Sequence, residues 1–337
     1  MKLAMLFLLM AGVVVGQSAP PVPIILDNDI GDDVDDALAL ALALQSPELE
    51  VRAVTTVMDV AAQRSRLAWK VLGVFGRQDI PVGTGADEPL LDAVRVRRHA
   101  QLDVLTDKDV IPGPPVRAVD LIIRTLLDSP RKITIVPIGA LTNIALALKI
   151  EPRIKDKIER IVLMGGAYYI PQLEYNVYRD RIASEIVFRS GVPITGVGLD
   201  VTMKCKLKAE DIERLRAAGN PNAAFLVRLI ELWREIPTNL YPTLHDPLAV
   251  GVAMLPSLVE TELGRVQVET SSPTLYGLTL FTPAARLPKD GPPANTSVAR
   301  TVDADRFVRL FMDRVSAPAR PSATNAARKI AERSGVK

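Results

Sequence analysis

Short apolar runs alternate with amphipathic stretches through the first two thirds of this chain. Several runs are rich in β-branched residues and apolar on both faces, which is typical of strands buried in a parallel sheet. They predict strands at Ile24–Leu26, Val51–Val57, Ile133–Ile138, Ile161–Met164 and Ile194–Leu199. The segments between them predict helices at Asp36–Gln45, Gln63–Phe75, Arg117–Leu127, Asn143–Lys149 and Arg181–Ser190. This order indicates a single α/β domain with a mostly parallel open sheet, covered by helices on both faces like a Rossmann-like core.

The two ends of the chain differ from this core. Residues 1–19 carry one positive charge at Lys2, continue through apolar residues from Leu3 to Val15 and end in small residues. This is the pattern of a cleaved signal peptide. An uncleaved anchor is the alternative, although it usually needs ~20 apolar residues. We therefore expect an exported protein, periplasmic or secreted, with no membrane segment after cleavage. The globular domain is expected over residues 20–315, followed by a flexible basic tail over residues 316–337.

The overall charge and the single cysteine exclude some classes of function. A formal net charge of +2 and the lack of a basic stripe with interleaved aromatic residues argue against nucleic-acid binding. Cys205 is the only cysteine, so no internal disulfide can form. It lies in VTMKCKLK with no histidine nearby, and we interpret it as a packing residue rather than a catalytic thiol.

The candidate chemistry begins with six aspartates within the ten residues Asp27–Asp36, which contain no lysine or arginine. Asp27 and Asp29 face the same side of a strand end, and Gly31 permits a sharp turn that returns three further carboxylates, those of Asp33, Asp35 and Asp36. A divalent cation would hold such a group together, and oxygen ligands alone favour Ca²⁺ or Mg²⁺. The alternative is that these residues cap the following helix and complement its dipole, which would explain one or two of them.

Two better-known uses of clustered aspartates fit less well. An EF-hand loop counted from Asp27 would need Gly at its sixth position and an acid at its twelfth, where the chain has Asp32 and Leu38. A phosphatase with an aspartyl nucleophile would need a specific downstream lysine and a second acidic pair, which the sequence does not indicate. Both readings are therefore disfavoured.

Two further segments carry candidate chemistry, and the sheet topology would bring them to the same edge. In TLHDPLAV, Asp246 before Pro247 is typical of a helix N-cap, whereas His245 is a candidate general acid. In EYNVYRD, Glu174 and Asn176 are suited to hydrogen bonding with the hydroxyls of a sugar.

Taken together, these segments resemble the inosine–uridine preferring nucleoside hydrolases. The matching pieces are LDNDIGDDVDDALAL, VPIGALTNIALAL, VLMGGAYY followed by EYN, VGLDVT and LHDPLAV, which follow the family's order over roughly Ile24 to Phe311. The resemblance implies a nucleoside hydrolase-like fold and calcium-dependent hydrolysis of the N-glycosidic bond of ribonucleosides to free base and ribose. It also implies a role in nucleoside salvage and a homodimer or homotetramer.

The resemblance further implies a role for each matching residue. Asp29 would ligate Ca²⁺ and act as the general base on a metal-bound water, and His245 would face and protonate the departing base. The other implied calcium ligands are Asp36, the backbone carbonyl of Ile138 and Asp246. The ribose would contact Asp35, Glu174 and Asn176. His99, in the polar segment Glu88–Gly113 that we interpret as a mobile insertion or lid, matches a second active-site histidine; a solvent-exposed lid histidine is the alternative.

The chain departs from the family pattern at three places. The aspartate pair before Ala37 comes two residues later than in the commoner DxDxGxDDA, so Asp33 could take a role given to Asp35 or Asp36 and is a further candidate calcium ligand. Tyr168 and Asp59 replace asparagines and are candidate substrate contacts that would alter the sugar or substrate preference. The alternative function is therefore an exported nucleoside- or sugar-binding protein with weak or no hydrolase activity. A metal-dependent phosphohydrolase and a structural calcium-binding protein are weaker alternatives.

Overall fold

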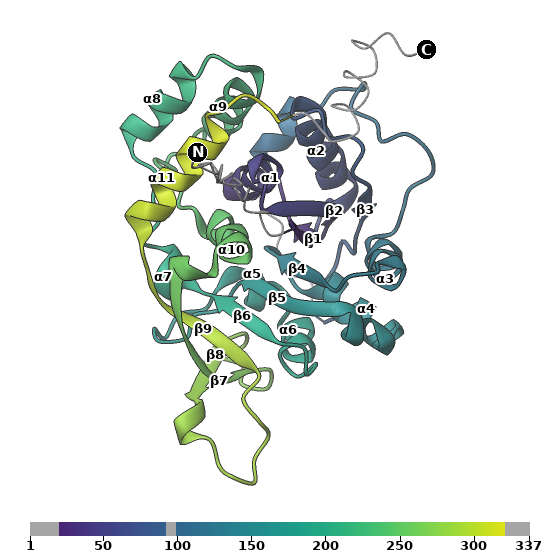
Figure 1. Ribbon diagram of the computed structural model, residues 1–337, viewed down its shortest axis with the longest axis vertical. Coiled ribbons are helices and arrows are strands. Elements are labelled where there is room, and N and C mark those ends of the chain that lie inside the picture. The colour runs from purple at the N-terminus through teal and green to yellow at the C-terminus, as the bar shows by residue number, and fades with distance from the viewer. Residues whose placement is uncertain (1–19, 92–98, 321–337) are drawn as a thin grey trace, which may run out of the picture.

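The computed structural model describes residues 20–91 and 99–320, so the predicted signal peptide, residues 92–98 of the predicted insertion and residues 321–337 of the tail lie outside it. One nine-stranded sheet crosses the molecule in the order β3-β2-β1-β4-β5-β6-β9-β7-β8 (Figure 1). The strands are β1 Val22–Asn28, β2 Leu49–Thr56, β3 Val82–Thr84, β4 Ile133–Pro137, β5 Ile158–Met164, β6 Ile194–Val197, β7 Val259–Val268, β8 Thr279–Pro283 and β9 Thr296–Val302.

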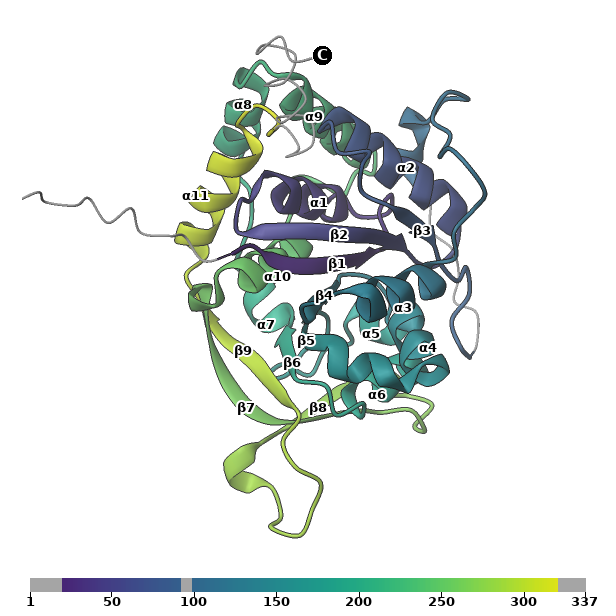
Figure 2. The ribbon, with the colours of Figure 1, turned by 45° about the vertical axis from the view of Figure 1, so that its right-hand side comes forward.

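Helices cover both faces of this sheet (Figure 2). One face carries α1 Asp35–Gln45, α2 Ala61–Val74, α8 Ala209–Ala217, α9 Pro221–Trp233, α10 His245–Met254 and α11 Ala304–Val315. The other face carries α3 Ala118–Asp128, α4 Thr142–Ile150 and α6 Arg181–Phe188. Two short helices, α5 Tyr175–Arg179 and α7 Leu199–Thr202, follow the strands β5 and β6. The predicted open α/β sheet with helices on both faces is confirmed.

The sheet is parallel from β3 to β9 and turns antiparallel at one edge. Strands β1 to β6 pair in parallel, and β9 pairs in parallel with β6. β7 runs antiparallel to both β9 and β8. The carboxyl ends of β1, β4, β5 and β6 therefore meet along one edge, where ligands bind in such sheets.

All five predicted strands and all five predicted helices are present, with ends that differ by a few residues. The predicted strand Ile194–Leu199, for example, stops at Val197, and Leu199 already opens α7. Gly198 lies between them, and a Cβ at Gly198 would come within 2.6 Å of the carbonyl oxygen of Gly166. The close approach of two loops thus ends the strand.

The helix α1 lies at the centre of the larger core, and all its residues are buried because its sequence alternates alanine and leucine after two aspartates. At its carboxyl end, Gln45 Nε2 donates hydrogen bonds to the carbonyls of Arg314, Ala317 and Pro318, and its Oε1 accepts one from the Arg320 backbone. The described start of the predicted tail is therefore held against α1. No helix in the described ranges is long and apolar enough to cross a membrane.

Candidate functional site

A cavity of about 660 Å³ opens at the carboxyl edge of the parallel strands. Its polar wall comes from the aspartate turn after β1, from α5 and from the start of α10. Its apolar wall comes from α7 and from the end of α9 with the loop that follows. The predicted site residues that line it are Asp29, Asp33, Asp35, Asp36, Ile138, Glu174, Asn176, His245 and Asp246.

The turn between β1 and α1 is shaped by its own backbone. Gly31 has a φ of +116°, which a residue with a side chain rarely adopts. The side-chain oxygen of Asn28 accepts a hydrogen bond from the backbone of Ile30 at 3.2 Å, and the Asp29 backbone donates to Asp36 Oδ1 at 3.1 Å. These bonds fold the turn back, so that Asp29 and the first turn of α1 face the same cavity.

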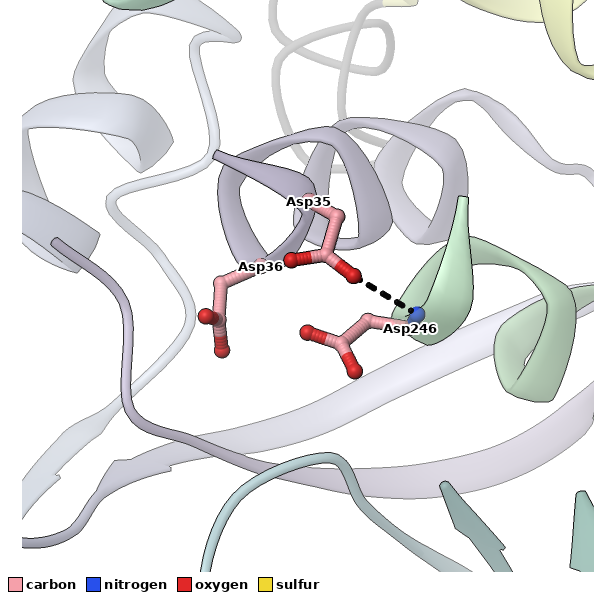
Figure 3. A group of neighbouring side chains, drawn as sticks. All are labelled: Asp35, Asp36 and Asp246. Atoms are coloured by element: carbon pink, nitrogen blue, oxygen red, sulfur yellow. Dashed lines mark hydrogen bonds between the residues drawn. The ribbon is translucent and has the colours of Figure 1, made fainter. Parts of the chain in front are cut away.

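Three carboxylates converge at this turn, and Figure 3 shows them pointing into one space. One oxygen from each of Asp35, Asp36 and Asp246 lies within 4.8 Å of the others, and all three side chains are buried. The backbone of Asp246 donates to Asp35 Oδ2 at 3.1 Å, which joins the start of α10 to the start of α1. Burial, and then repulsion from neighbouring aspartates, raises the pKa of each of these carboxyl groups well above its usual range.

This cluster fits a hard divalent cation. Its donors are carboxylate oxygens only, and the cost of burying them together is removed when a cation binds between them. Two members, Asp36 and Asp246, are ligands that the resemblance implies, whereas Asp35 was expected at the ribose. Asp33 is exposed, and its Oδ1 accepts a hydrogen bond from the backbone of Val34 at 2.6 Å.

Asp29 lies on the cavity wall next to the end of β4. It is 6% exposed, and burial raises the pKa of its carboxyl group to about 6. A Cβ at Gly139 would come within 2.8 Å of Asp29 Oδ1, so only glycine leaves room for the carboxylate. The carbonyl of Ile138 accepts a hydrogen bond from Asn176 Nδ2 at 3.0 Å, which connects the end of β4 to α5.

Hydrogen bonds to the backbone hold the predicted sugar-binding residues Glu174 and Asn176 in place. The Glu174 carboxylate caps α5 by accepting bonds from the backbones of Asn176 and Val177, and it accepts a third from Gly166 at 2.9 Å. Asn176 Nδ2 also lies 3.2 Å from the carbonyl of Met164. Both side chains are buried yet reach the cavity. Burial raises the pKa of Glu174.

His245 opens α10 and lines the same cavity, directly before Asp246 of the carboxylate cluster. Its Nδ1 lies 2.7 Å from Thr202 Oγ1 on α7. Burial, with a smaller contribution from the charge of Lys206, lowers the pKa of the imidazole to about 4. The ring is therefore neutral at physiological pH.

Asp59 and His99 do not line the cavity. Asp59 is buried and pairs with two arginines: its Oδ1 lies 2.5 Å from Arg179 Nη2 and its Oδ2 lies 3.4 Å from Arg64 Nη2. The Nε2 atom of His99 lies 3.9 Å from the same carboxylate, and the histidine side chain is only 7% exposed. Its alternative interpretation as a solvent-exposed residue therefore does not describe this structure.

Tyr168 is also placed away from the cavity wall. Its hydroxyl donates to the carbonyl of Gly165 at 2.8 Å, and its ring contacts the edge of Phe281 at a centroid distance of 6.5 Å. A Cβ at Gly196 or Gly198 would come within 2.4 Å or 2.8 Å of Tyr168 side-chain atoms. The tyrosine thus packs beneath the turn between β6 and α7.

The structure adds wall residues that the sequence did not single out. These are Asp32, Met164, Gln172, Leu173, Leu199, Met203, Ile236, Thr238 and Asn239. In the sequence Asp32 is one of the six clustered aspartates, without a role of its own. In the structure its Oδ2 accepts a hydrogen bond from the hydroxyl of Tyr175 at 3.3 Å. Trp233 is both packed in the core and part of the wall. Met164 ends β5 and Leu199 opens α7, whereas Gln172, Leu173, Ile236, Thr238 and Asn239 lie in loops outside the matching segments.

Comparisons with known proteins agree on one family. Residues 24–309 match the family model described as inosine-uridine preferring nucleoside hydrolase. The chain is 38% identical over 307 residues to a pyrimidine-specific ribonucleoside hydrolase, RihA, of Shewanella sp. (strain ANA-3), covering 86% of this chain and 95% of the relative.

Two solved structures are similar in both sequence and fold. A purine-preferring ribonucleoside hydrolase from Gardnerella vaginalis is 34% identical with a TM-score of 0.74, covering 87% of this chain and 98% of that one. The plant nucleoside hydrolase PpNRh1 is 30% identical with a TM-score of 0.76, covering 89% and 100%.

Proposed function

The chain belongs to the inosine–uridine preferring nucleoside hydrolase family, and we propose that it hydrolyses ribonucleosides with a calcium ion held at the aspartate cluster. It is an N-glycosyl hydrolase whose products are a free base and ribose. The strongest support for the calcium-dependent mechanism is one observation. The buried carboxylates of Asp35, Asp36 and Asp246 converge beside Asp29, in the same cavity as His245.

The ion would be held mainly by the three clustered carboxylates. Asp29 and the carbonyl of Ile138 complete the set that the family resemblance implies, and both lie on the same cavity wall. A bound Ca²⁺ supplies Lewis acidity, which lowers the pKa of water and makes it a better nucleophile near neutral pH. Oxygen-only coordination agrees with calcium, which accepts six to eight such ligands.

The side chains around the cavity would carry out the other steps of the reaction. Asp29 would act as the general base that takes a proton from the attacking water. Asp35, Glu174 and Asn176 would bind and orient the ribose hydroxyls. The surrounding carboxylates would stabilise the positive charge that develops on the sugar as the bond to the base breaks. His245, which lines the same cavity, would donate to the departing base.

This arrangement differs from that of most O-glycosidases, which use two carboxyl groups on either side of the scissile bond. Here acidic groups and one histidine line a single cavity, and a bound cation would take the place of one carboxyl group. We also propose that the protein is exported through its N-terminal segment and that it assembles into a homodimer or homotetramer.

The binding-protein alternative depended on Tyr168 and Asp59 as altered substrate contacts. Neither side chain lines the cavity, and both have structural partners. The alternative therefore has no observation in its favour within the described residues.

The first test is ribose release from a panel of purine and pyrimidine ribonucleosides. Both base classes are needed, since the relatives include a pyrimidine-specific and a purine-preferring enzyme. We expect Asp29→Asn to lower kcat by at least ~100-fold, whereas the exposed control Asp313→Asn should keep full activity. Bound calcium is measured in parallel by elemental analysis. Turnover by Asp29→Asn close to that of the unchanged protein would refute the role of the general base.

A further inference from the structure

Thr202 contacts the active-site histidine without reaching the cavity itself. It is the last residue of α7, and its side chain is fully buried. Its Oγ1 lies 2.7 Å from Nδ1 of His245, while the imidazole also forms part of the cavity wall. The threonine therefore contacts the ring from outside the set of residues that line the cavity.

The direction of this hydrogen bond follows from the burial of Thr202. Within the described residues, the bond to His245 is the one side-chain hydrogen bond that the Thr202 hydroxyl makes. A buried hydroxyl that does not donate its proton is costly, so the hydroxyl donates to the only acceptor it contacts. Nδ1 must then carry no proton, and the proton of a neutral ring lies on Nε2.

The backbone around Thr202 is held rigidly. The Asp200 carboxylate accepts hydrogen bonds from the backbones of Tyr168 and Tyr169 at 2.8 and 2.9 Å, which ties α7 to the loop after β5. The Tyr168 ring fills the space over Gly198, directly before α7. Tyr168, which stands where the family pattern has asparagine, thus packs against the start of α7, the helix that carries Thr202.

We propose that Thr202 is a positioning residue that fixes His245 as a neutral donor, with its Nε2–H directed to the departing base. This inference rests on the proposed function, since it needs His245 to act on the leaving group. The electron pair of the broken C–N bond stays on the base and is stabilised by the Nε2–H hydrogen bond. Overall, one water supplies the new hydroxyl of ribose and the proton of the free base, so the imidazole ends the reaction unchanged.

The kinetic test compares two leaving groups. Thr202→Val keeps the shape of the side chain and removes the hydroxyl. We expect it to lower kcat on inosine and uridine by roughly 10- to 100-fold, with little change in KM. Hydrolysis of nitrophenyl riboside, whose leaving group needs no donor, should stay within about twofold. Thr202→Ser should restore most of the rate on the nucleosides.

Two controls separate this role from a structural one. Thr296→Val removes the hydroxyl of another fully buried threonine, on β9, and should leave both substrates unaffected. Adding Thr202→Val to His245→Ala should cause no further selective loss. An equal loss on both substrates, or none on either, would overturn the positioning role. A lack of selective loss in His245→Ala itself would instead refute the leaving-group role in the proposed function.

A spectroscopic test does not depend on activity. The chain contains two histidines, so ¹⁵N labelling of histidine gives two sets of ring signals, and His245→Ala assigns them. We expect the calcium-loaded protein to show His245 with its proton on Nε2 at neutral pH. Thr202→Val should give a mixture of tautomers, and Thr202→Ser should return the Nε2–H form. A proton on Nδ1 of His245 in the unchanged protein would overturn the inference.

Discussion

Asp59 and Arg179 form an ion pair in the interior of the protein, with 2.5 Å between Oδ1 and Nη2. Arg64 reaches the same carboxylate from α2, and its other nitrogens donate to the carbonyls of Ile30 and Met58 at 3.0 Å. Because Ile30 follows Asp29 directly, this ion cluster connects the aspartate turn to α5. Asp59 adopts a left-handed φ of 55°, which is uncommon for a residue other than glycine.

We expect Asp59→Asn to destabilise the protein by about 3 kcal/mol or more, because it leaves two buried guanidinium groups with less negative charge. Urea unfolding of the calcium-loaded protein measures the loss. The matched control is Asp313→Asn, which breaks an exposed pair with Arg214 and should change the stability little. A similar small change for both variants would mean that the buried cluster contributes little.

Asp246→Asn should have opposite effects on the two forms of the protein. In the presence of calcium it removes a ligand, so metal content and stability should fall. Without calcium it relieves the repulsion with Asp35 and Asp36, so the metal-free variant should be more stable than the metal-free unchanged protein. Elemental analysis and thermal unfolding with and without calcium test both signs. Unchanged metal content would exclude Asp246 as a ligand.

Removal of calcium should change how stability depends on pH. In the metal-free fold burial raises the pKa of six carboxyl groups, so the folded chain binds more protons than the unfolded chain above about pH 4. These groups are Asp27, Asp29, Asp35, Asp36, Glu174 and Asp246. The two histidines and four carboxyl groups outside the core, those of Asp109, Asp120, Glu151 and Glu269, have lowered pKa values and act in the opposite sense. The shifts of the buried aspartates Asp27, Asp35, Asp36 and Asp246 are larger and set the direction.

The free energy of unfolding of the metal-free protein should therefore fall as the pH rises from about 4 to about 7, the value to which the pKa of Asp27 rises. With calcium in excess the trend should reverse, since the ligands must lose their protons to bind it. Urea unfolding at about pH 5 and about pH 8, with desalted and calcium-loaded protein, measures both slopes. Parallel slopes would show that the cluster does not hold the ion.

Tyr168→Phe should lower the stability by about 1 kcal/mol through loss of the hydrogen bond to Gly165. Because the ring still packs over Gly196 and Gly198, kcat and KM for nucleosides should change by less than about twofold. Steady-state kinetics beside thermal unfolding tests this separation. A large rise in KM with unchanged stability would return Tyr168 to the substrate-binding residues.

The sequence predicts five of the seven parallel strands, β1, β2, β4, β5 and β6, because these strands are largely buried and their apolar runs are nearly continuous. It does not predict β3, which has three residues, or β9, whose TSVARTV mixes polar and apolar residues. The sequence is less informative for β7, VETELGRVQV, which lies in the antiparallel part of the sheet. Its apolar residues are separated by polar, mostly exposed ones, so it has no continuous apolar run. The short helices α5 and α7 are also missed, since their boundaries depend on tertiary contacts such as the cap at Glu174.

The acidic part of the site is predictable from sequence because six neighbouring aspartates need a common partner. The roles of single residues are less so. Position 59 and position 168 could be identified as unusual, but their partners Arg64, Arg179 and Gly198 lie far along the chain or on other elements. The Thr202 contact is likewise formed between two distant segments, VGLDVT and LHDPLAV.

The position of Gln45 matters for how this protein can be altered. α1 carries Asp35 and Asp36 at one end and the Gln45 hydrogen bonds to residues 314–320 at the other. A truncation or a fusion junction placed directly after α11 would cut this connection and loosen the helix on which the ion site is built. An affinity tag should therefore follow Arg320, and a shortened chain that ends at Val315 would reveal its defect first as weaker retention of calcium.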